Sequence, residues 1–245
     1  MADFRIEIAG TVFAVTSLFD STKDYCHNYL TEKTADSVLT VSPDELIFEQ
    51  EALDQEAREE GLKRRKFSDP FLERAAIQRK VAQLLRRRNT LLFHGSGLAV
   101  DGKGYLFAAA RCGTGKSTHT RYWREVFADR AVMINDDKPF LQLAPGGVIM
   151  HGAPWSGKHG LDTNLSVPLQ GLCVLQRGSE NTIVPLKPEE AEEMLLHQSL
   201  LPGESEPDDL QKALAAALAR SVPLWCMTCT KDPAAARMAF DAMSR

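Results

Sequence analysis

The chain has 245 residues, which is enough for one large domain, or one domain with a small additional lobe, and for a sizeable core. Its net charge of −4, with 44% hydrophobic and 25% charged residues, is ordinary for a globular protein and argues against nucleic acid or a membrane as partner. There is no run of 18 apolar residues, and the five cysteines are scattered, so we expect a reduced, cytoplasmic protein without a disulfide framework.

Residues 1–89 are expected to form a small N-terminal α+β lobe. The predicted elements are, in order, strands over Phe4–Ser17, a short helix near Lys23–Leu30, strands over Ser37–Phe48 and a charged stretch over Glu49–Lys66. A longer helix is predicted from Asp69, which suits an N-cap because Pro70 follows at the first helical position.

The pattern changes at residue 90, and residues 90–245 predict a second domain of the α/β class. Its first elements are a strand over Thr90–His94, a hairpin over Leu98–Ala109 around an Asp101-Gly102 turn, a glycine-rich loop, a helix over Ser117–Ala128 and a strand over Ala131–Ile134. Later elements are strands over Gly147–His151, Gly171–Gln176 and around Trp225, and helices over Pro188–Leu200, Asp208–Arg220 and Pro233–Met243. The order strand, loop, helix, strand is typical of phosphate-binding α/β proteins.

The glycine-rich loop, Gly113-Thr-Gly-Lys-Ser117, matches the core of a phosphate-binding loop (P-loop). Its glycines let backbone N–H groups converge on phosphate oxygens, and the following helix adds its N-terminal amides. Lys116 would neutralise the β- and γ-phosphates of ATP or a similar nucleotide, while the Ser117 hydroxyl would coordinate Mg²⁺. Ala110 stands where a full motif has its first glycine. The predicted nucleotide-binding residues are Cys112, Gly113, Thr114, Gly115, Lys116, Ser117 and Thr118.

Two adjacent acids, Asp136 and Asp137, follow the apolar strand. Ligands of open α/β sheets bind at the carboxyl ends of strands, so these acids are expected beside the nucleotide. Asp136 would orient Mg²⁺, and Asp137 would accept a proton from an attacking hydroxyl. The structural alternative is a solvated acidic turn.

Two further segments have both a functional and a structural interpretation. His94 ends a strand just before the hairpin, where a lone histidine is more often structural than catalytic. The segment Trp155–Asp162 is rich in glycine and carries Lys158 and His159. It predicts a mobile, positively charged loop that closes on phosphate or substrate. The alternative is an ordinary surface turn.

Cys226 and Cys229 have the spacing of a metal-binding or redox pair. They lie in a predicted strand, however, where residues i and i+3 point to opposite faces. No second pair of ligands completes a zinc site in the sequence. We therefore expect a buried strand with two structural thiols.

His94-Gly95, the Gly113–Ser117 loop and the Asp136-Asp137 pair resemble, in order and spacing, the catalytic domain of bacterial HPr kinase/phosphorylase, of the PEP-carboxykinase-like P-loop group. The stretch Ala110–Asp137 is more similar to HPr-kinase-related proteins of bacteria. The resemblance covers residues 90–180 and implies a mixed, strongly twisted sheet flanked by helices. It also implies proton transfer by His94 and Asp137 and phosphorylation of a serine hydroxyl. Cys112 replaces the family's serine, and no HPr-engaging segment is found.

We therefore predict an ATP- and Mg²⁺-dependent kinase that transfers the γ-phosphoryl group to a hydroxyl of a peptide, a small protein or a small molecule. The predicted catalytic residues are Asp137, His94, Lys116 and Lys158, and the predicted metal ligands are Ser117 and Asp136. Two alternatives are phosphoryl transfer of the PEP-carboxykinase type and a non-catalytic, nucleotide-gated binding module. The sequence leaves open the acceptor, the choice of ATP or GTP, the reverse reaction and whether the chain forms a homo-oligomer.

Overall fold

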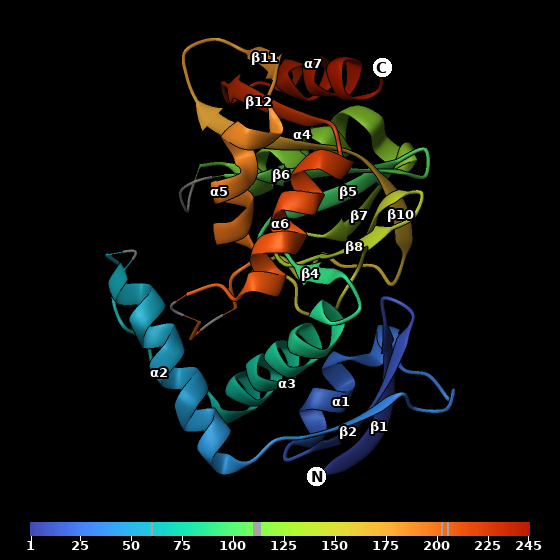
Figure 1. The fold of residues 1–245 in the computed structure, drawn as a ribbon, viewed down its shortest axis with the longest axis vertical. Helices are drawn as coiled ribbons and strands as arrows, with labels where there is room; N and C mark the ends of the chain where they lie inside the picture. The colour runs from blue at the N-terminus through green and yellow to red at the C-terminus, as the bar shows by residue number, and fades with distance from the viewer. Residues whose placement is uncertain (60, 110–113, 202, 205) are drawn as a thin grey trace.

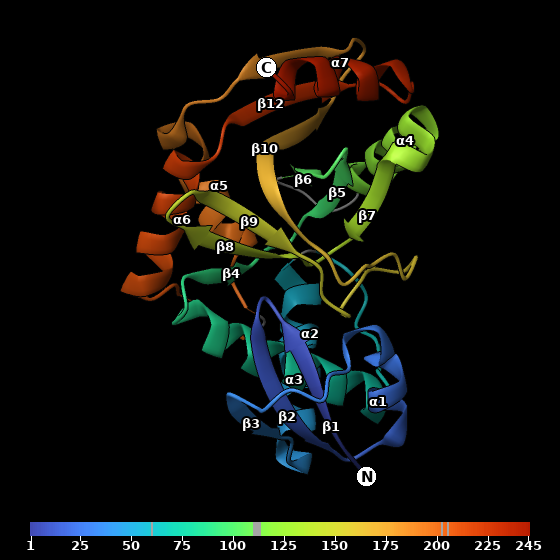
Figure 2. The same cartoon turned by 90° about the vertical axis from the view of Figure 1, so that its right-hand side faces the viewer.

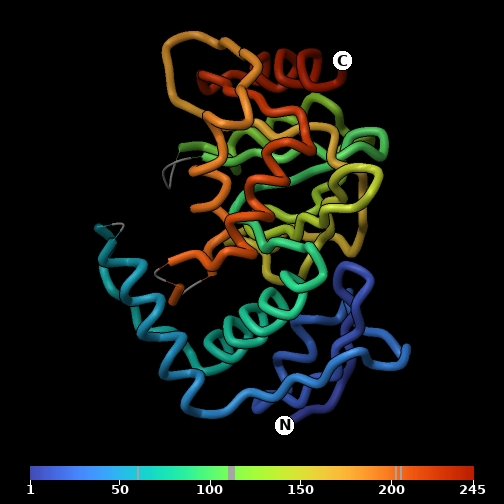
Figure 3. Tube along the Cα trace, viewed as in Figure 1, coloured from blue at the N-terminus to red at the C-terminus, as the bar shows by residue number. Residues whose placement is uncertain are grey.

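The computed structural model describes residues 1–59, 61–109, 114–201, 203–204 and 206–245, which form two β-sheets. The small three-stranded sheet lies at the N-terminal end of the molecule, and the nine-stranded sheet lies at the other end (Figure 1). The chain runs from one end to the other, so its two termini are far apart (Figure 3). Among the described helices, none has the length and apolarity needed to cross a membrane.

The small sheet is a hairpin with one added strand. Strands β1 (Ala2–Ile8) and β2 (Thr11–Ser17) pair antiparallel, and β3 (Ser37–Thr40) pairs parallel with β2. Helix α1 (Asp20–Tyr25) and a short 3-10 helix, η1 (His27–Tyr29), connect β2 to β3. Alternating apolar side chains of the hairpin pack against helix α3 (Asp69–Arg86), which has Ser68 at its N-cap and buries Ala76, Ile77, Val81 and Leu85.

The predicted strand over Ser37–Phe48 is wrong beyond Thr40, because helix α2 (Pro43–Glu59) begins three residues later. Pro43 suits the first helical turn, and the Glu45 carboxylate accepts a hydrogen bond from the Ser42 N–H at 3.0 Å, which caps the helix. The same helix covers most of the charged stretch after Phe48. Charged side chains of α2 face α3 and form ion pairs that hold the two helices together.

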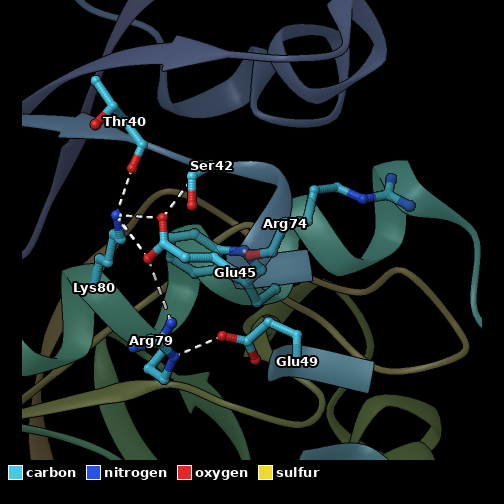
Figure 4. Close-up of polar contacts among 8 residues, drawn as sticks. Thr40, Ser42, Glu45, Glu49, Arg74, Arg79 and Lys80 are labelled. Atoms are coloured by element: carbon cyan, nitrogen blue, oxygen red, sulfur yellow. Dashed lines mark hydrogen bonds and ion pairs between the residues drawn. The ribbon is translucent and has the colours of Figure 1, made fainter. Parts of the chain in front are cut away.

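Figure 4 shows this contact between α2 and α3. Lys80 Nζ lies 2.8 Å from Glu45 Oε1, and Arg79 Nε donates to Glu49 Oε1 at 2.6 Å. Glu49 is fully buried, and its burial raises the pKa of the carboxyl group although Arg79 opposes the effect. Pairing with Arg79 is what makes a carboxylate tolerable at this position.

The large sheet is mixed. Its main path has the strand order β4-β8-β9-β10-β6-β5-β7, and β12 pairs with both β10 and β11. The long strand β10 is antiparallel to β9 over Ser166–Pro168, then parallel to β6 from Leu169 and to β12 from Leu172, which makes the sheet curl. The predicted mixed sheet of an α/β protein is therefore confirmed. The strands are β4 (Thr90–Leu92), β5 (Ser96–Val100), β6 (Lys103–Ala108), β7 (Ala131–Asn135), β8 (Phe140–Ala144), β9 (Gly147–His151), β10 (Ser166–Arg177), β11 (Thr182–Pro185) and β12 (Leu224–Cys229).

The predicted hairpin is confirmed as β5 and β6. Asp101 and Gly102, at its turn, both have positive φ, of 52° and 76°. Two such residues in a two-residue connection match the twist of the flanking strands, which explains the preference for Asp-Gly there. Strands β8 and β11, by contrast, were not predicted.

Four helices cover the two faces of the large sheet (Figure 2). Helices α4 (Lys116–Phe127) and α7 (Ala234–Met243) pack on one face around Trp123, whose ring contacts those of Tyr105, Phe127 and Phe240. Helices α5 (Pro188–Gln198) and α6 (Asp209–Ser221) pack on the other face. These four correspond to the predicted helices.

The core of the N-terminal region continues into the large sheet. Leu92, Phe140 and Trp155 belong to the same hydrophobic cluster as β1, β2 and α3. Residues 1–89 therefore pack directly on the β4–β8 edge of the large sheet, and a boundary at residue 89 stays a prediction. This packing brings α3 and η1 beside the segment that follows β9.

Cys226 and Cys229 lie in β12, as predicted for two structural thiols in a strand. Both are half-buried rather than fully buried. Across the described residues, no group of three or more His, Cys, Asp or Glu side chains could hold a metal ion.

Candidate functional site

The N-terminus of α4 is one wall of the site. Helix α4 begins at Lys116, one residue before the predicted start, and Gly115 at the N-cap has φ of 118°. This conformation is strained for any residue with a Cβ, so glycine is required where the chain turns into the helix. Thr114, Ser117 and Thr118 surround this turn. Cys112 and Gly113, which were predicted to bind nucleotide, lie outside the described residues.

Three of the predicted catalytic residues meet beside this helix end. His94 Nε2 lies 3.4 Å from Asp137 Oδ1 and 3.3 Å from Lys116 Nζ. The three side chains come from different segments, after β4, after β7 and at the start of α4. A protonated Nε2 donates to Asp137, whereas an unprotonated Nε2 accepts from Lys116. The cluster can therefore stabilise His94 with Nε2 protonated, facing Asp137, or with Nε2 unprotonated, facing Lys116.

The backbone ties the two loops of this cluster together. The His94 N–H donates to the Gln198 carbonyl at 2.8 Å, and the Gly95 N–H donates to the Asp137 carbonyl at 2.9 Å. His94 is thus held between α5 and the turn after β7. This arrangement fixes the histidine relative to Asp137 through the main chain as well as through the side chains.

The two adjacent acids have opposite electrostatic environments. Burial raises the pKa of Asp137, but the hydrogen bond from His94 and the charges of Lys138 and Lys116 outweigh it, so its pKa lies below the usual value. Burial and the charge of Asp137 together raise the pKa of Asp136, which is only 6% exposed. Asp137 is therefore a stable carboxylate at neutral pH, while Asp136 gains most from a nearby cation.

Asn135 holds the turn that carries both acids. Its side-chain oxygen accepts from the N–H groups of Asp137 at 2.8 Å and Lys138 at 2.6 Å. Its amide nitrogen donates to the carbonyls of Ala153 at 2.8 Å and Trp155 at 3.3 Å. Asn135 is fully buried and was not predicted as a site residue. An asparagine directly before the acid pair was the available signal, because such side chains commonly bond the backbone two residues on.

A cavity of about 290 Å³ lies on the Asp136 side of the turn. It brings together Ser117 and Asp136, the two predicted metal ligands. The residues that line it are Ser117, Thr120, Arg121, Arg124, Asp136, His159 and Leu161. Arg121 and Arg124 were not predicted, although their spacing of four and seven from Ser117 places all three on one helix face. The Ser117 hydroxyl and the Asp136 carboxylate suit Mg²⁺, which usually takes one or two protein ligands in addition to phosphates and water.

The segment after β9 is anchored to the N-terminal region. Trp155 Nε1 donates to the Arg74 carbonyl at 2.8 Å, and the Tyr29 hydroxyl donates to Asp162 at 3.0 Å. The glycine content predicted a mobile loop, whereas the structure holds both of its ends. Lys158 is exposed at the tip and does not line the cavity. The structure therefore does not bring Lys158 together with the other predicted catalytic residues.

Gly157 is the point where this segment touches the acid pair. Its N–H donates to Asp136 Oδ1, and a Cβ at this position would lie 3.2 Å from the Asp137 Cβ and 3.3 Å from the Asp136 carboxylate oxygens. A side chain here would have to push both aspartates by a few tenths of an ångström, so glycine suits this close approach. His159, two residues later, reaches the cavity.

A family model described as "SynChlorMet cassette protein ScmC" matches residues 71–231, which is more than half of the chain. The chain therefore belongs to the SynChlorMet cassette protein ScmC family. No curated protein matches it. Among solved structures, it has a distant likeness to the Hpr(Ser) kinase/phosphatase from Coxiella burnetii, with 14% identity and a TM-score of 0.36 over 63% of this chain and 99% of that one.

Proposed function

We propose that the protein is an ATP-dependent kinase that requires Mg²⁺ and transfers the γ-phosphoryl group to a hydroxyl. The observation that carries the proposal is a cluster at a helix N-terminus, in which Lys116 lies 3.3 Å and Asp137 lies 3.4 Å from His94 Nε2. A lysine at a helix N-terminus attracts phosphate, and a carboxylate beside it can accept a proton. A P-loop domain of the PEP-carboxykinase-like group over residues 90–245, with a lobe over residues 1–89, belongs to the same proposal.

The residues divide the reaction between them. Lys116 and the first amides of α4 bind the β- and γ-phosphates, and Ser117 and Asp136 hold Mg²⁺, which neutralises charge on those phosphates. The acceptor oxygen attacks the γ-phosphorus while the bond to the β–γ bridging oxygen breaks. The acceptor proton passes to Asp137, and ADP leaves. His94 orients Asp137 and stabilises its charge through the 3.4 Å contact.

The ionisation state of Asp137 and the exposed position of Lys158 both fit this division of roles. The lowered pKa of Asp137 keeps the carboxyl group ionised at neutral pH, which is the form that can accept a proton. Lys158 and His159 lie on the same short segment, and Lys158 is exposed. We propose that Lys158 contacts the acceptor from this tip.

Nucleotide binding is tested with Lys116→Ala, with the exposed Lys103→Ala as the matched control. Calorimetry with MgATP should show a loss of about ten-fold or more in affinity for Lys116→Ala and none for Lys103→Ala. Equal affinity of the Lys116 variant and the wild type would exclude the phosphate-binding assignment.

Transfer is tested by incubating the protein with radiolabelled ATP and cell extract, followed by separation of labelled proteins from labelled metabolites. Asp137→Asn should lower the rate by about 10²–10⁴-fold with little loss of MgATP affinity. MgATP binding without transfer to any acceptor would instead favour a nucleotide-gated binding module.

A further inference from the structure

Arg124 is a half-buried cation without a partner in the described part of the chain. Its guanidinium makes no hydrogen bond or ion pair there, and its Nε is buried. Two other half-buried arginines are paired with carboxylates, Arg79 with Glu49 and Arg86 with Glu204. A third, Arg74, lies over the Tyr25 ring at 4.4 Å. Burying a charge is unfavourable unless it is paired, so this side chain points to a missing anion.

Arg124 lines the cavity that also holds Ser117 and Asp136. Side chains of an α-helix lean toward its N-terminus, so Arg124 leans back along α4 toward the phosphate-binding end. Arg121 lines the same cavity one turn nearer, and its contact with Glu125 is an exposed one at 3.6 Å. Two arginines therefore line the cavity that holds the two proposed Mg²⁺ ligands.

The position favours the acceptor over the nucleotide. Arg124 is eight residues beyond Lys116, which corresponds to about 12 Å along the helix axis. In the proposed function, Lys116, the helix amides and Mg²⁺ already neutralise the nucleotide phosphates. A cavity of about 290 Å³ is at the lower end of the range for ligand pockets, so it suits a small molecule.

We propose that the acceptor is a small, hydroxyl-bearing molecule whose carboxylate or phosphate group is bound by Arg124 with help from Arg121. The inference rests on the proposed kinase function for the identity of the reaction, but the anion site itself does not. The planar guanidinium binds either anion through two parallel hydrogen bonds. The anionic group stays unchanged in the reaction, and only the hydroxyl oxygen forms a new bond to phosphorus.

The test uses three probes: D-glycerate and glycerol 3-phosphate, which carry a hydroxyl and an anion, and glycerol, which carries hydroxyls alone. Calorimetry should show binding of at least one anionic probe to the wild type and none of glycerol. Arg124→Gln should weaken that binding by about ten-fold or more while MgATP affinity changes by less than about two-fold. Arg237→Gln, at an exposed position on α7, is the matched control and should bind like the wild type.

Two results would overturn the inference. One is that neither anionic probe binds the wild type at millimolar concentration. The other is that Arg124→Gln weakens MgATP as much as the anions, which would place the guanidinium on the nucleotide. A melting curve like that of the wild type shows that the variant is folded. Failure of the kinase proposal has a different signature, because Lys116→Ala would then leave MgATP affinity unchanged while Arg124→Gln still weakened anion binding.

Discussion

Replacing Asn135 with alanine removes the side chain that holds the acid-bearing turn. The variant loses four hydrogen bonds, two to the N–H groups of Asp137 and Lys138 and two to the carbonyls of Ala153 and Trp155. A hydrogen bond contributes about 1 kcal/mol net, and an unsatisfied buried group costs about 1–3 kcal/mol. The bonds to Asp137 and Lys138 are only partly buried and should contribute less, so we expect a total loss of about 3 kcal/mol in the free energy of unfolding.

Urea unfolding followed by tryptophan fluorescence measures this loss. With a slope of about 3 kcal/mol per molar urea, the midpoint should fall by about 1 M. Asn164→Ala is the matched control, because Asn164 is exposed and makes one bond, to the Asn28 carbonyl at 3.0 Å. It should lose less than about 0.5 kcal/mol. A loss below about 1 kcal/mol for Asn135→Ala, or equal losses in the two variants, would refute the positioning role.

Asn135→Asp separates the two halves of this role. The new carboxylate can still accept from the N–H groups of Asp137 and Lys138, but it cannot donate to Ala153 and Trp155. It also adds a third negative charge beside the acid pair, which should raise the pKa of Asp136 further. We expect a stability between those of the wild type and Asn135→Ala, with phosphoryl transfer reduced more than MgATP affinity.

Gly157→Ala should lower the rate of transfer without unfolding the protein, because its Cβ would crowd both aspartates; the control Gly146→Ala, which has no atom within 4 Å of the added Cβ, should be neutral in both assays. Asp136→Asn should raise the Mg²⁺ concentration for half-maximal activity by about ten-fold, and an unchanged Mg²⁺ titration would contradict its role as ligand. Burial lowers the pKa of His119 and His151 to about 4, so both are neutral in the folded protein and their contribution to stability, complete above pH 6.5, is lost as the pH falls toward 4. For each of the two histidines, the free energy of unfolding should be about 2 kcal/mol lower at pH 5 than at pH 7. His151→Gln should remove one of these two contributions, which is about half of the combined difference. If the variant and the wild type lose the same stability between pH 7 and pH 5, the lowered pKa of His151 is not a cause of the acid sensitivity.

Local patterns in the sequence predicted most elements of the large sheet and its helices. The Asp101-Gly102 turn was predictable because both residues tolerate the positive φ that the turn requires. Helix α4 was predictable because its apolar residues recur at helical spacing. The short apolar run before Glu49 was assigned to a strand because three consecutive apolar residues fit both periods. In the structure this run is part of helix α2, which is stabilised by packing against α3 through ion pairs between the two helices.

The types of residue that the site needs were visible in the sequence itself. A lysine in a glycine-rich loop and an acid pair after an apolar strand each have a chemical meaning at fixed spacing, and they predicted Lys116, Asp136 and Asp137. The catalytic role of His94 came from the family resemblance. The structure places all four residues at one helix end. They also predicted a role for Lys158, which the structure leaves at an exposed tip.

Only the tertiary structure decided which side chains meet. His94 and Asp137 are separated by 42 intervening residues and come together because β4 and β7 end beside α4. The bonds of Asn135 and the anchoring of the segment after β9 arise from contacts between distant segments. The burial of Arg124 Nε, which has no partner among the described residues, likewise depends on the packing around α4. Spacing along the chain carries no information about such contacts, because sheet pairing and burial set them. The sequence therefore determined the chemistry that is available, and the packing of the two sheets determined where it is assembled.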